Sequence, residues 1–406
     1  MTDRLRVFYA LGPGDVVDAY RKWSGGTDYT AETSLTFSGQ FFDFCKAHGV
    51  QAYAVSSHSA RELLRDGPFV VENRPKLFSD PHGLLFHLNQ IWYGLSIIVS
   101  ALRFRAHVLI VDSGTTHWFV LSLLALTRVR VVAGLHNVYW PSGYPPSGGV
   151  KRIVRALDGW FWRTCADATI CVSPECQRQV ETLARGRNRP VFQYRCQFGP
   201  SDFQSVPPPP PHDERPFRVA FAGRVEENKG VFDLLEMAAR LEREFPGQLR
   251  FDICGGGNAL DELTKKVEEQ RLGEIVRLRG KLKRPELLAV YGNSHVVIVP
   301  TRSTFCEGMP MVAAEAILTG RPVLSSRLAN AHDVLDGALI EAQPDDVASY
   351  VDCLRRLMTD RDYYEKCRQA CSAVQQQFYD RQQGLAAAVG RAIQSFGITL
   401  PAQAQP

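Results

Sequence analysis

The chain alternates between short apolar runs and longer segments in which apolar residues recur at helical spacing. Strands are predicted in the C-terminal half near residues 217–222, 249–254, 275–279, 295–301 and 322–326. The run at 295–301 is apolar and β-branched, which is typical of a buried parallel strand. Helical periodicity fills the intervals between them, as in residues 258–270 and 311–318. Alternation of this kind favours right-handed crossovers and a doubly wound α/β sheet.

The N-terminal half shows the same alternation. Strands are predicted at residues 7–11, 107–111 and 129–134, and a helix is predicted to begin at His117. The apolar segment 84–102 contains polar side chains and is too polar for a membrane span, so we expect it to form a buried helix.

A proline run at residues 207–211 marks the domain boundary, since such a tract is extended, stiff and unable to join a sheet. We predict an N-terminal acceptor-binding domain at 1–199, a linker at 200–216 and a C-terminal nucleotide-sugar-binding domain at 217–379. The remaining residues, 380–406, are predicted to form a helix that packs back on the N-terminal domain, followed by a frayed tail.

Charge and cysteine content limit the functional classes. Residues 1–199 carry 22 Lys and Arg against 15 Asp and Glu, a net +7, whereas the whole chain is +4. This asymmetry fits a basic face that meets an acidic acceptor or a membrane surface, and it is too small to indicate nucleic acid. The ten cysteines form no C-x-x-C pair and no zinc spacing, which favours reduced thiols in a cytoplasmic protein without a metal site. No signal peptide is visible.

Two carboxylates stand eight positions apart around a predicted helix start. Glu307 follows the strand at 295–301, and Glu315 falls within the helix 311–318, which we expect to begin at Pro310 and to be followed by Gly320. The backbone N–H groups of Gly308 and Met309, which lie between the two carboxylates, have no intrahelical partner. An anion-tolerant site beside two hydroxyl-binding carboxylates suits a sugar joined to a phosphate.

Two further strand ends carry candidate chemistry. Gly223 ends the strand at 217–222, and Arg224 and Lys229 flank the turn into the next helix, where a guanidinium and an ammonium suit a diphosphate. Gly255 and Gly257 follow the strand at 249–254 and allow close approach of the backbone to a ligand.

Together these motifs resemble the retaining, nucleotide-sugar-dependent glycosyltransferases of family 4, also described as group 1. The resemblance covers residues 216–347 well and the N-terminal half loosely. It implies the GT-B fold, in which two Rossmann-like doubly wound domains face each other across a cleft. It also implies a nucleotide-diphosphate sugar as donor substrate and no metal or other cofactor.

The resemblance also implies roles for individual residues. Arg224 and Lys229 would hold the donor diphosphate, and Glu315 would bind the ribose hydroxyls. Glu307 would contact the transferred sugar, together with the backbone of 308–310. Met309-Pro310 departs from the family pattern, which often has an aromatic residue and a second glycine here, and this departure leaves the identity of the sugar open.

In the N-terminal half, His136 follows the strand at 129–134, where family members carry a histidine that approaches the donor. A satisfied structural histidine is the alternative reading. Gly12 and Gly14 would form the glycine-rich loop that closes on the donor phosphate, with residues 25–26 as an alternative. Residues 15–36 are predicted to be a long loop that shapes the acceptor site.

The segment 150–163 is amphipathic and basic. We expect its apolar face, which includes Val150, Ile153, Leu157 and Phe161, to pack on the sheet. An interfacial helix that meets anionic lipid is the alternative.

The sequence therefore predicts a cytoplasmic retaining hexosyltransferase of the GT-B type that acts on an acceptor glycan or lipid-linked saccharide in cell-surface glycan biosynthesis. Peripheral contact with the inner membrane surface is part of this hypothesis. A nucleotide-sugar epimerase and a catalytically idle nucleotide-sugar-binding scaffold are the alternatives.

Overall fold

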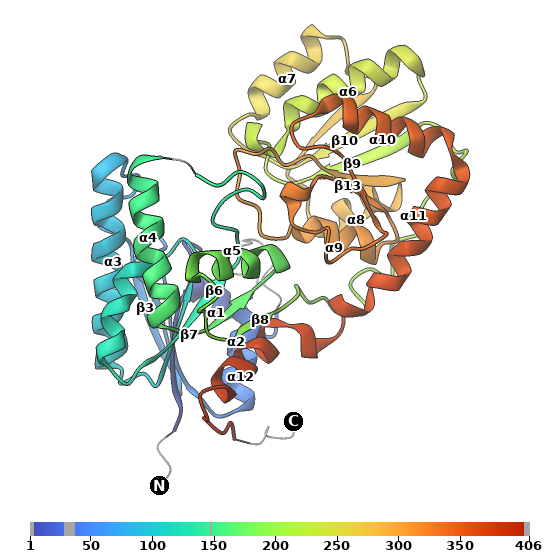
Figure 1. Cartoon of the computed structure of the whole chain (residues 1–406). Helices are drawn as coiled ribbons and strands as arrows, with labels where there is room; N and C mark the ends of the chain where they lie inside the picture. The colour runs from blue at the N-terminus through green and yellow to red at the C-terminus, as the bar shows by residue number, and fades with distance from the viewer. Residues whose placement is uncertain (1–3, 28–36, 147, 402–406) are drawn as a thin grey trace. The chain divides into compact units, whose positions relative to one another are not determined.

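A computed structural model of the chain describes residues 4–27, 37–146 and 148–401 (Figure 1). The chain forms two compact units. The N-terminal unit consists of Met1–His136, Pro146–Arg195 and Arg381–Pro406, and the C-terminal unit consists of Asn137–Pro145 and Cys196–Asp380. Each unit is built around its own mostly parallel sheet, as the alternating hydrophobic pattern predicts.

Among its described residues, the N-terminal unit has an eight-stranded sheet in the order β3-β4-β2-β1-β5-β6-β7-β8. All neighbours are parallel except β3 and β4, which form an antiparallel pair. The strands are β1 (Arg6–Ala10), β2 (Gln51–Ser56), β3 (Glu62–Asp66), β4 (Phe69–Asn73), β5 (Val108–Asp112), β6 (Arg130–Leu135), β7 (Ala166–Cys171) and β8 (Val191–Gln193).

Helices cover this sheet. They are α1 (Val16–Ser24), α2 (Ser38–Ala47), α3 (Gly83–Arg103), α4 (Gly149–Thr164), α5 (Pro174–Ala184) and α12 (Leu385–Gln394), with 3-10 helices η2 (Trp118–Leu126) and η6 (Arg381–Gln383). The C-terminal helix α12 packs against α2, where Gln40 Oε1 accepts a hydrogen bond of 2.9 Å from Leu385 N. The last described part of the chain therefore belongs to the N-terminal unit.

In its described residues, the C-terminal unit has a six-stranded parallel sheet in the order β11-β10-β9-β12-β13-β14. The strands are β9 (Phe217–Ala222), β10 (Leu249–Cys254), β11 (Val276–Gly280), β12 (Val296–Val299), β13 (Val323–Ser325) and β14 (Leu339–Glu341). The order corresponds to 3-2-1-4-5-6, the arrangement of dinucleotide-binding folds, in which the chain reverses direction across the sheet between its first and fourth strands.

The core of the C-terminal unit lies between this sheet and its helices, with Phe217, Phe251 and Leu241 fully or almost fully buried. The helices are α6 (Val231–Glu244), α7 (Leu260–Glu269), α8 (Arg284–Gly292), α9 (Met311–Leu318), α10 (Val347–Thr359) and α11 (Arg361–Val374), with 3-10 helices η3 (Glu227–Lys229), η4 (Arg327–Ala329) and η5 (Gln376–Phe378).

Two local predictions were wrong. The segment 15–36 is not a continuous loop, because α1 begins at once: Asp15 caps it by accepting a hydrogen bond from Asp18 N at 2.9 Å. Residues 28–36 lie outside the described part of the chain. Pro310 is the N-cap of α9, with extended ψ of 126°, and Met311 is the first helical residue. The helix predicted to begin at His117 is present as the 3-10 helix η2, with His117 as its N-cap.

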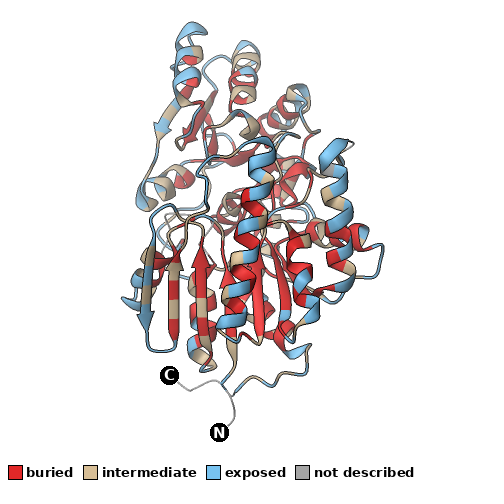
Figure 2. Cartoon of the chain, turned by 90° about the vertical axis from the view of Figure 1, so that its left-hand side faces the viewer, coloured by how far each residue is buried: buried red, intermediate tan, exposed pale blue. Residues whose placement is uncertain are grey.

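The predicted packing of two N-terminal helices was also wrong. The segment 84–102 forms α3, but only its inner side is buried, and its outer side exposes large apolar residues. In α4 the structure buries Asp158, Phe161 and Trp162, while Val150, Ile153 and Leu157 are exposed. Figure 2 views the molecule from the side on which α3 and α4 lie in Figure 1, and the outward sides of the helices there are coloured as exposed.

The proline-rich segment is part of the C-terminal unit and packs on it. His212 is buried and its Nε2 lies 3.1 Å from the carbonyl oxygen of Leu357. Pro207 packs so closely on α8 that a Cβ at Gly292 would lie 3.0 Å from its Cδ. These contacts hold the segment predicted as a linker on the surface of one unit.

Candidate functional site

The predicted donor-site residues gather at the carboxyl end of the C-terminal sheet. β9 and β12 are neighbours at the point where the strand order reverses, which is where ligands of open α/β sheets bind. Gly223 directly follows β9, and Thr301 follows β12 by two positions. The loops that carry the predicted residues therefore leave the sheet at its topological switch point.

Glycines allow these loops to approach one another closely. Gly255 has φ of 146°, and a Cβ there would lie 1.8 Å from the carbonyl oxygen of Gly223. A Cβ at Gly257 would lie 2.3 Å from the carbonyl oxygen of Val225, and Gly223 N donates to Cys254 O at 3.0 Å. The glycines thus serve backbone packing between the loops after β9 and β10, and their contact with a ligand stays a prediction.

Arg224 and Lys229 both lie close to one aromatic ring. The Arg224 guanidinium carbon is 5.4 Å from the centroid of Phe305, and Lys229 Nζ is 3.9 Å from it. Arg224 is exposed and pairs with Glu226 at 2.7 Å, whereas the side chain of Lys229 is 15% exposed. Cation–π attraction places the two cations on the same ring, so they can act on one polyanion. The sequence analysis assigned no role to Phe305.

Glu307 is held in place by the residues around it. Its Oε2 forms an ion pair with Lys229 and accepts a hydrogen bond from Thr301 Oγ1 at 3.2 Å. Asn330, in a left-handed conformation with φ of 52°, donates from Nδ2 to the backbone carbonyl of Glu307. The predicted Lys229 and Glu307 are therefore partners across 78 positions of sequence.

Glu315 has two partners on α8. Arg284 forms an ion pair with its Oε1, and Tyr291 donates a hydrogen bond of 2.9 Å to its Oε2. Burial, followed by the nearby Glu315 charge, raises the pKa of the Tyr291 hydroxyl well above its ordinary value, so that it remains a donor. Each carboxylate oxygen has a second lone pair, which leaves Glu315 able to accept hydroxyls of a ligand.

Arg284 and Tyr291 stand seven positions apart, two turns along one helix, and therefore on the same face of α8. That spacing is the only signal by which the sequence analysis could have found the pair.

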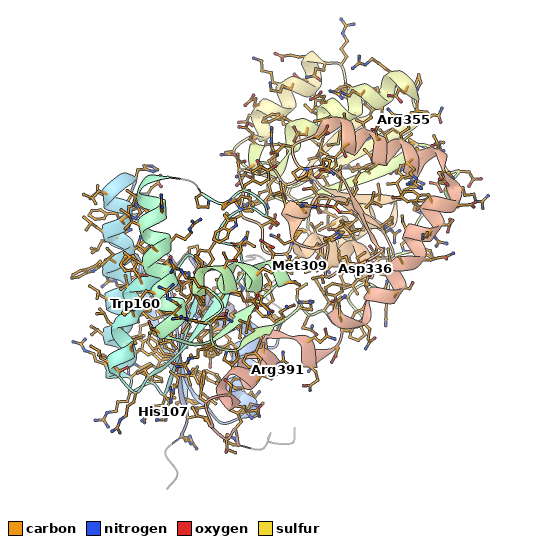
Figure 3. The ribbon with its side chains drawn as sticks, in the orientation of Figure 1. His107, Trp160, Met309, Asp336, Arg355 and Arg391 are labelled. Carbon is orange, nitrogen blue, oxygen red and sulfur yellow. The ribbon has the colours of Figure 1, made fainter. Side chains whose placement is uncertain are left out.

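The segment that leads into α9 offers backbone donors. Gly308 and Pro310 are buried, and Met309, labelled in Figure 3, is partly exposed. Among the described residues, the N–H groups of Gly308 and Met309 donate no backbone hydrogen bond. These N–H groups lie beside Glu307 at a helix N-terminus, which attracts negative charge.

In the N-terminal unit, His136 belongs to a buried hydrogen-bonded network. Its Nε2 lies 2.8 Å from Asp112 Oδ2, and its Nδ1 shares a hydrogen bond of 2.5 Å with the Tyr194 hydroxyl. Tyr9 donates to the same Asp112 oxygen at 2.7 Å, and Phe37 stacks on the imidazole with centroids 5.3 Å apart. This network fixes the ring as a structural histidine requires, while 21% of the side chain stays exposed.

Gly12 and Gly14 lie in the short connection from β1 to α1. Ser57 N donates to the carbonyl of Gly12 at 3.3 Å, and Asn73 Nδ2 donates to Asp15 Oδ1 at 2.7 Å. β1 and β5 are neighbours at the switch point of this sheet, so the connection occupies a ligand-binding position. Gly25, the alternative candidate, is the C-cap of α1.

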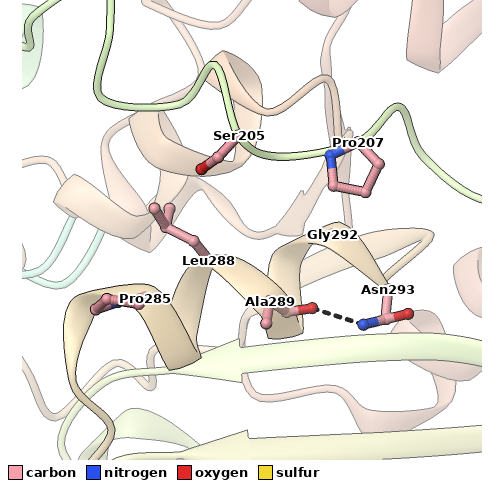
Figure 4. A pocket seen from close by; sticks show the side chains of 7 residues that line it. All are labelled: Ser205, Pro207, Pro285, Leu288, Ala289, Gly292 and Asn293. Carbon is pink, nitrogen blue, oxygen red and sulfur yellow. Dashed lines mark hydrogen bonds between the residues drawn. The ribbon is translucent and has the colours of Figure 1, made fainter.

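A pocket on the C-terminal unit is lined by other residues (Figure 4). Its lining comes from Ser205, Pro207 and α8, and it carries no charged side chain. It therefore does not suit a diphosphate. Within residues 4–27, 37–146 and 148–401, no group of three or more His, Cys, Asp or Glu side chains is placed to hold a metal ion.

Comparison with known proteins matches both halves of the chain. The family described as "Glycosyl transferases group 1" matches residues 202–373, and the family described as "Glycosyltransferase Family 4" matches residues 43–192. A glycogen synthase of Mycobacterium tuberculosis is 26% identical over 216 residues, which is 53% of this chain and 50% of that protein. A D-inositol 3-phosphate glycosyltransferase of Catenulispora acidiphila is 28% identical over 60% of this chain and 63% of its own length. The chain thus spans less than two thirds of either relative.

Solved structures match the whole architecture. Sucrose-phosphate synthase of Thermosynechococcus elongatus superposes with a TM-score of 0.68 at 16% identity and covers 97% of this chain and 99% of its own. A structure of Anabaena HepE in complex with UDP superposes with a TM-score of 0.62 at 12% identity and covers 97% of this chain and 99% of its own. At these identities the likeness establishes the fold.

Proposed function

The chain belongs to family 4 of the glycosyltransferases and has the GT-B fold, and from this premise we propose that it is a retaining enzyme. It would move a sugar from a nucleotide-diphosphate sugar to an acceptor hydroxyl. The observation that carries the proposal is the convergence of Arg224 and Lys229 on Phe305, with Lys229 paired to Glu307, at the switch point of the C-terminal sheet.

The donor would bind along the loops of that unit. Lys229 has three N–H donors and uses one on Glu307, so the others are available to a phosphate. Arg224 is exposed and can leave Glu226 for the diphosphate, which offers a bidentate partner. Glu315 would accept the ribose hydroxyls, and Glu307 with the backbone of 308–310 would contact the sugar.

Catalysis would rest on stabilising the negative charge that develops on the leaving phosphate. The two cations and the backbone N–H groups at a helix start would supply this stabilisation, and electrostatic stabilisation of developing charge is usually the largest catalytic term. The acceptor hydroxyl would attack from the face that the phosphate leaves, and the departing phosphate would take its proton. Glu307 then need not be a nucleophile, in keeping with its ion pair to Lys229. Neither a metal nor another cofactor is required.

The family resemblance implies roles for residues of the N-terminal unit as well. His136, fixed by Asp112 and Tyr194, would approach the sugar, and the connection that carries Gly12 and Gly14 would contact the phosphate. We further propose a cytoplasmic enzyme of glycan or glycolipid biosynthesis. The names of the relatives, a glycogen synthase and a D-inositol 3-phosphate glycosyltransferase, suggest an α-glucan and an inositol phosphate as the first acceptors to test.

The test is sugar transfer from UDP-, GDP-, ADP- and CDP-sugars to these acceptors and to a lipid-linked saccharide. Transfer is measured as the nucleoside diphosphate that is released. Lys229→Ala is compared with Lys265→Ala; the side chain of Lys265, on α7, is 75% exposed. We expect transfer with retained anomeric configuration, and a loss of about a hundredfold or more in Lys229→Ala alone. Inversion of the anomeric centre, or donor turnover that needs no acceptor, would overturn the proposal.

A further inference from the structure

The outer surface of the N-terminal unit carries apolar residues at coiled-coil spacing that nothing in the chain covers among the described residues. Along α3 they recur at alternating intervals of three and four positions, so they form one stripe. The exposed fractions are 51% for Leu85, 50% for Leu88, 58% for Trp92, 36% for Leu95, 45% for Val99 and 43% for Leu102. Isolated exposed apolar residues need no explanation, but a continuous stripe marks an interaction surface.

Two neighbouring elements extend the stripe. On α4, Val150, Ile153, Leu157 and Trp160 repeat the same spacing and are 57%, 63%, 42% and 48% exposed; Trp160 is labelled in Figure 3. On η2, Leu123 and Leu126 are 54% and 91% exposed. We call these residues of α3, η2 and α4 together the outer apolar surface.

The three elements are held together as one body. Asp158 of α4 is buried and accepts a hydrogen bond of 3.0 Å from Phe119 N of η2. Gly94 of α3 lies so close to the start of η2 that a Cβ there would be 2.4 Å from Thr116 Oγ1. The surface is therefore a rigid feature of this unit, seen along the left-hand side of Figure 1 and facing the viewer in Figure 2.

The charges on these elements have one sign. α3 and η2 contain no Asp or Glu, and the single acidic residue of α4, Asp158, is buried. The cations that border the apolar residues are exposed: Arg103 ends α3, Arg105 follows it, and Arg152 lies on α4. A second copy of the chain docked through this surface would bring cations against cations, which opposes association. An anionic partner with an apolar interior has the complementary chemistry.

We propose that the outer apolar surface docks on an anionic lipid bilayer. Its leucines and tryptophans would enter the boundary between head groups and acyl chains, and its arginines would contact the lipid phosphates, as in interfacial amphipathic helices. This inference does not depend on the sugar or the acceptor of the proposed reaction.

The helix α3 lies on the bilayer in this proposal and does not cross it. Among the described helices it alone is long and apolar enough to span a membrane. Its inner side, however, is committed to the protein: Asn89 Nδ2 donates to Phe78 O at 2.9 Å, and Thr116 Oγ1 donates to Gln90 O at 2.8 Å. Extracting α3 would break these buried hydrogen bonds, whereas docking the outer side leaves them intact.

The test is co-sedimentation of the full chain with vesicles of phosphatidylcholine alone and with about one third phosphatidylglycerol. Leu88→Glu is compared with Leu63→Glu, an equally exposed leucine on β3, at 50% and 51%. We expect Leu88→Glu to weaken partition into anionic vesicles about thirtyfold, from lost apolar contact and charge repulsion. Arg152→Gln and Arg103→Gln should each weaken it about fivefold, and Leu63→Glu should have no effect.

Size-exclusion chromatography of the same proteins without lipid decides between lipid and protein partners. A monomeric wild type that pellets only with anionic vesicles supports the proposal. Absence of pelleting, equal pelleting of Leu88→Glu and wild type, or a wild-type dimer that Leu88→Glu converts to monomer would overturn it. Retained melting temperature in each variant shows that the substitution acts on the surface and not on the fold.

Discussion

Gly255 provides a sharp test of how the donor-site loops are built. Its φ of 146° belongs to a region that side chains rarely adopt, and a Cβ would lie 1.8 Å from the carbonyl oxygen of Gly223. We predict that Gly255→Ala forces the loops after β9 and β10 apart. Arg224 stands on the displaced loop, so nucleotide binding should weaken together with stability.

The magnitude follows from two terms. Backbone strain of this kind amounts to about 1–3 kcal/mol, and forcing an extra methyl against packed atoms adds about 1–3 kcal/mol. The sum, about 2–6 kcal/mol, corresponds to a fall of roughly 4–24 °C in the melting temperature of a domain of this size. The adjacent Gly256 is the matched control, because a Cβ there would first meet the flexible Lys281 side chain at 3.5 Å.

The assay is thermal unfolding of wild type, Gly255→Ala and Gly256→Ala, each with and without nucleoside diphosphate. Gly256→Ala should stay within about 1 kcal/mol of wild type. If the two alanine variants melt at the same temperature, the backbone packing described here does not hold the loops, and the reasoning is refuted.

Three further predictions concern buried charges. Lys229→Ala should destabilise the C-terminal unit by about 3 kcal/mol, because Glu307 loses its cation. Adding Glu307→Gln to this variant should restore most of the lost stability, measured by chemical denaturation. Additive effects of the two substitutions would show that the residues are not coupled. Tyr291→Phe should cost about 1.5–3 kcal/mol, since a charged acceptor on Glu315 loses a donor, and an unchanged denaturation midpoint would count against that hydrogen bond. Burial raises the pKa of Asp158 from 3.8 to about 7, so between these pH values the folded state binds more protons than the unfolded state. The free energy of unfolding should therefore fall as pH rises through this range. Asp158→Asn should flatten this pH dependence, and an equally steep dependence in the variant would contradict the assignment.

The regular parts of the fold could be predicted because strands and helices leave local patterns of apolar residues in the sequence. The run that became β12 is apolar along its whole length, as a strand buried on both faces must be. The runs that became β9 and β10 are mostly apolar, and α9 spans the predicted residues 311–318. The three-residue strand β14 was missed. Asp15 is of a residue type favoured at helix N-caps and therefore signals the start of α1 within the segment predicted as a loop.

The site could be predicted only in part, because partner choice depends on tertiary structure. Lys229 and Glu307 were each predicted, but nothing local shows that they pair across the sheet edge. Tyr291 and Arg284 were missed for the same reason, since their role comes from Glu315 on another helix. For α3, an apolar composition predicts burial without saying whether protein or another medium covers the outer side.

The most direct test of the central claim is a thermal-shift titration with UDP, GDP, ADP and CDP on wild type, Arg224→Ala and the matched control Arg277→Ala, an exposed arginine on β11. A nucleotide at a hundred times its dissociation constant adds about 2.7 kcal/mol to the stability of the state that binds it. The account predicts stabilisation by one nucleotide, lost in Arg224→Ala and kept in Arg277→Ala. If none of the four nucleotides raises the melting temperature, or if Arg224→Ala keeps the wild-type shift, the donor site at the switch point of the C-terminal sheet is contradicted.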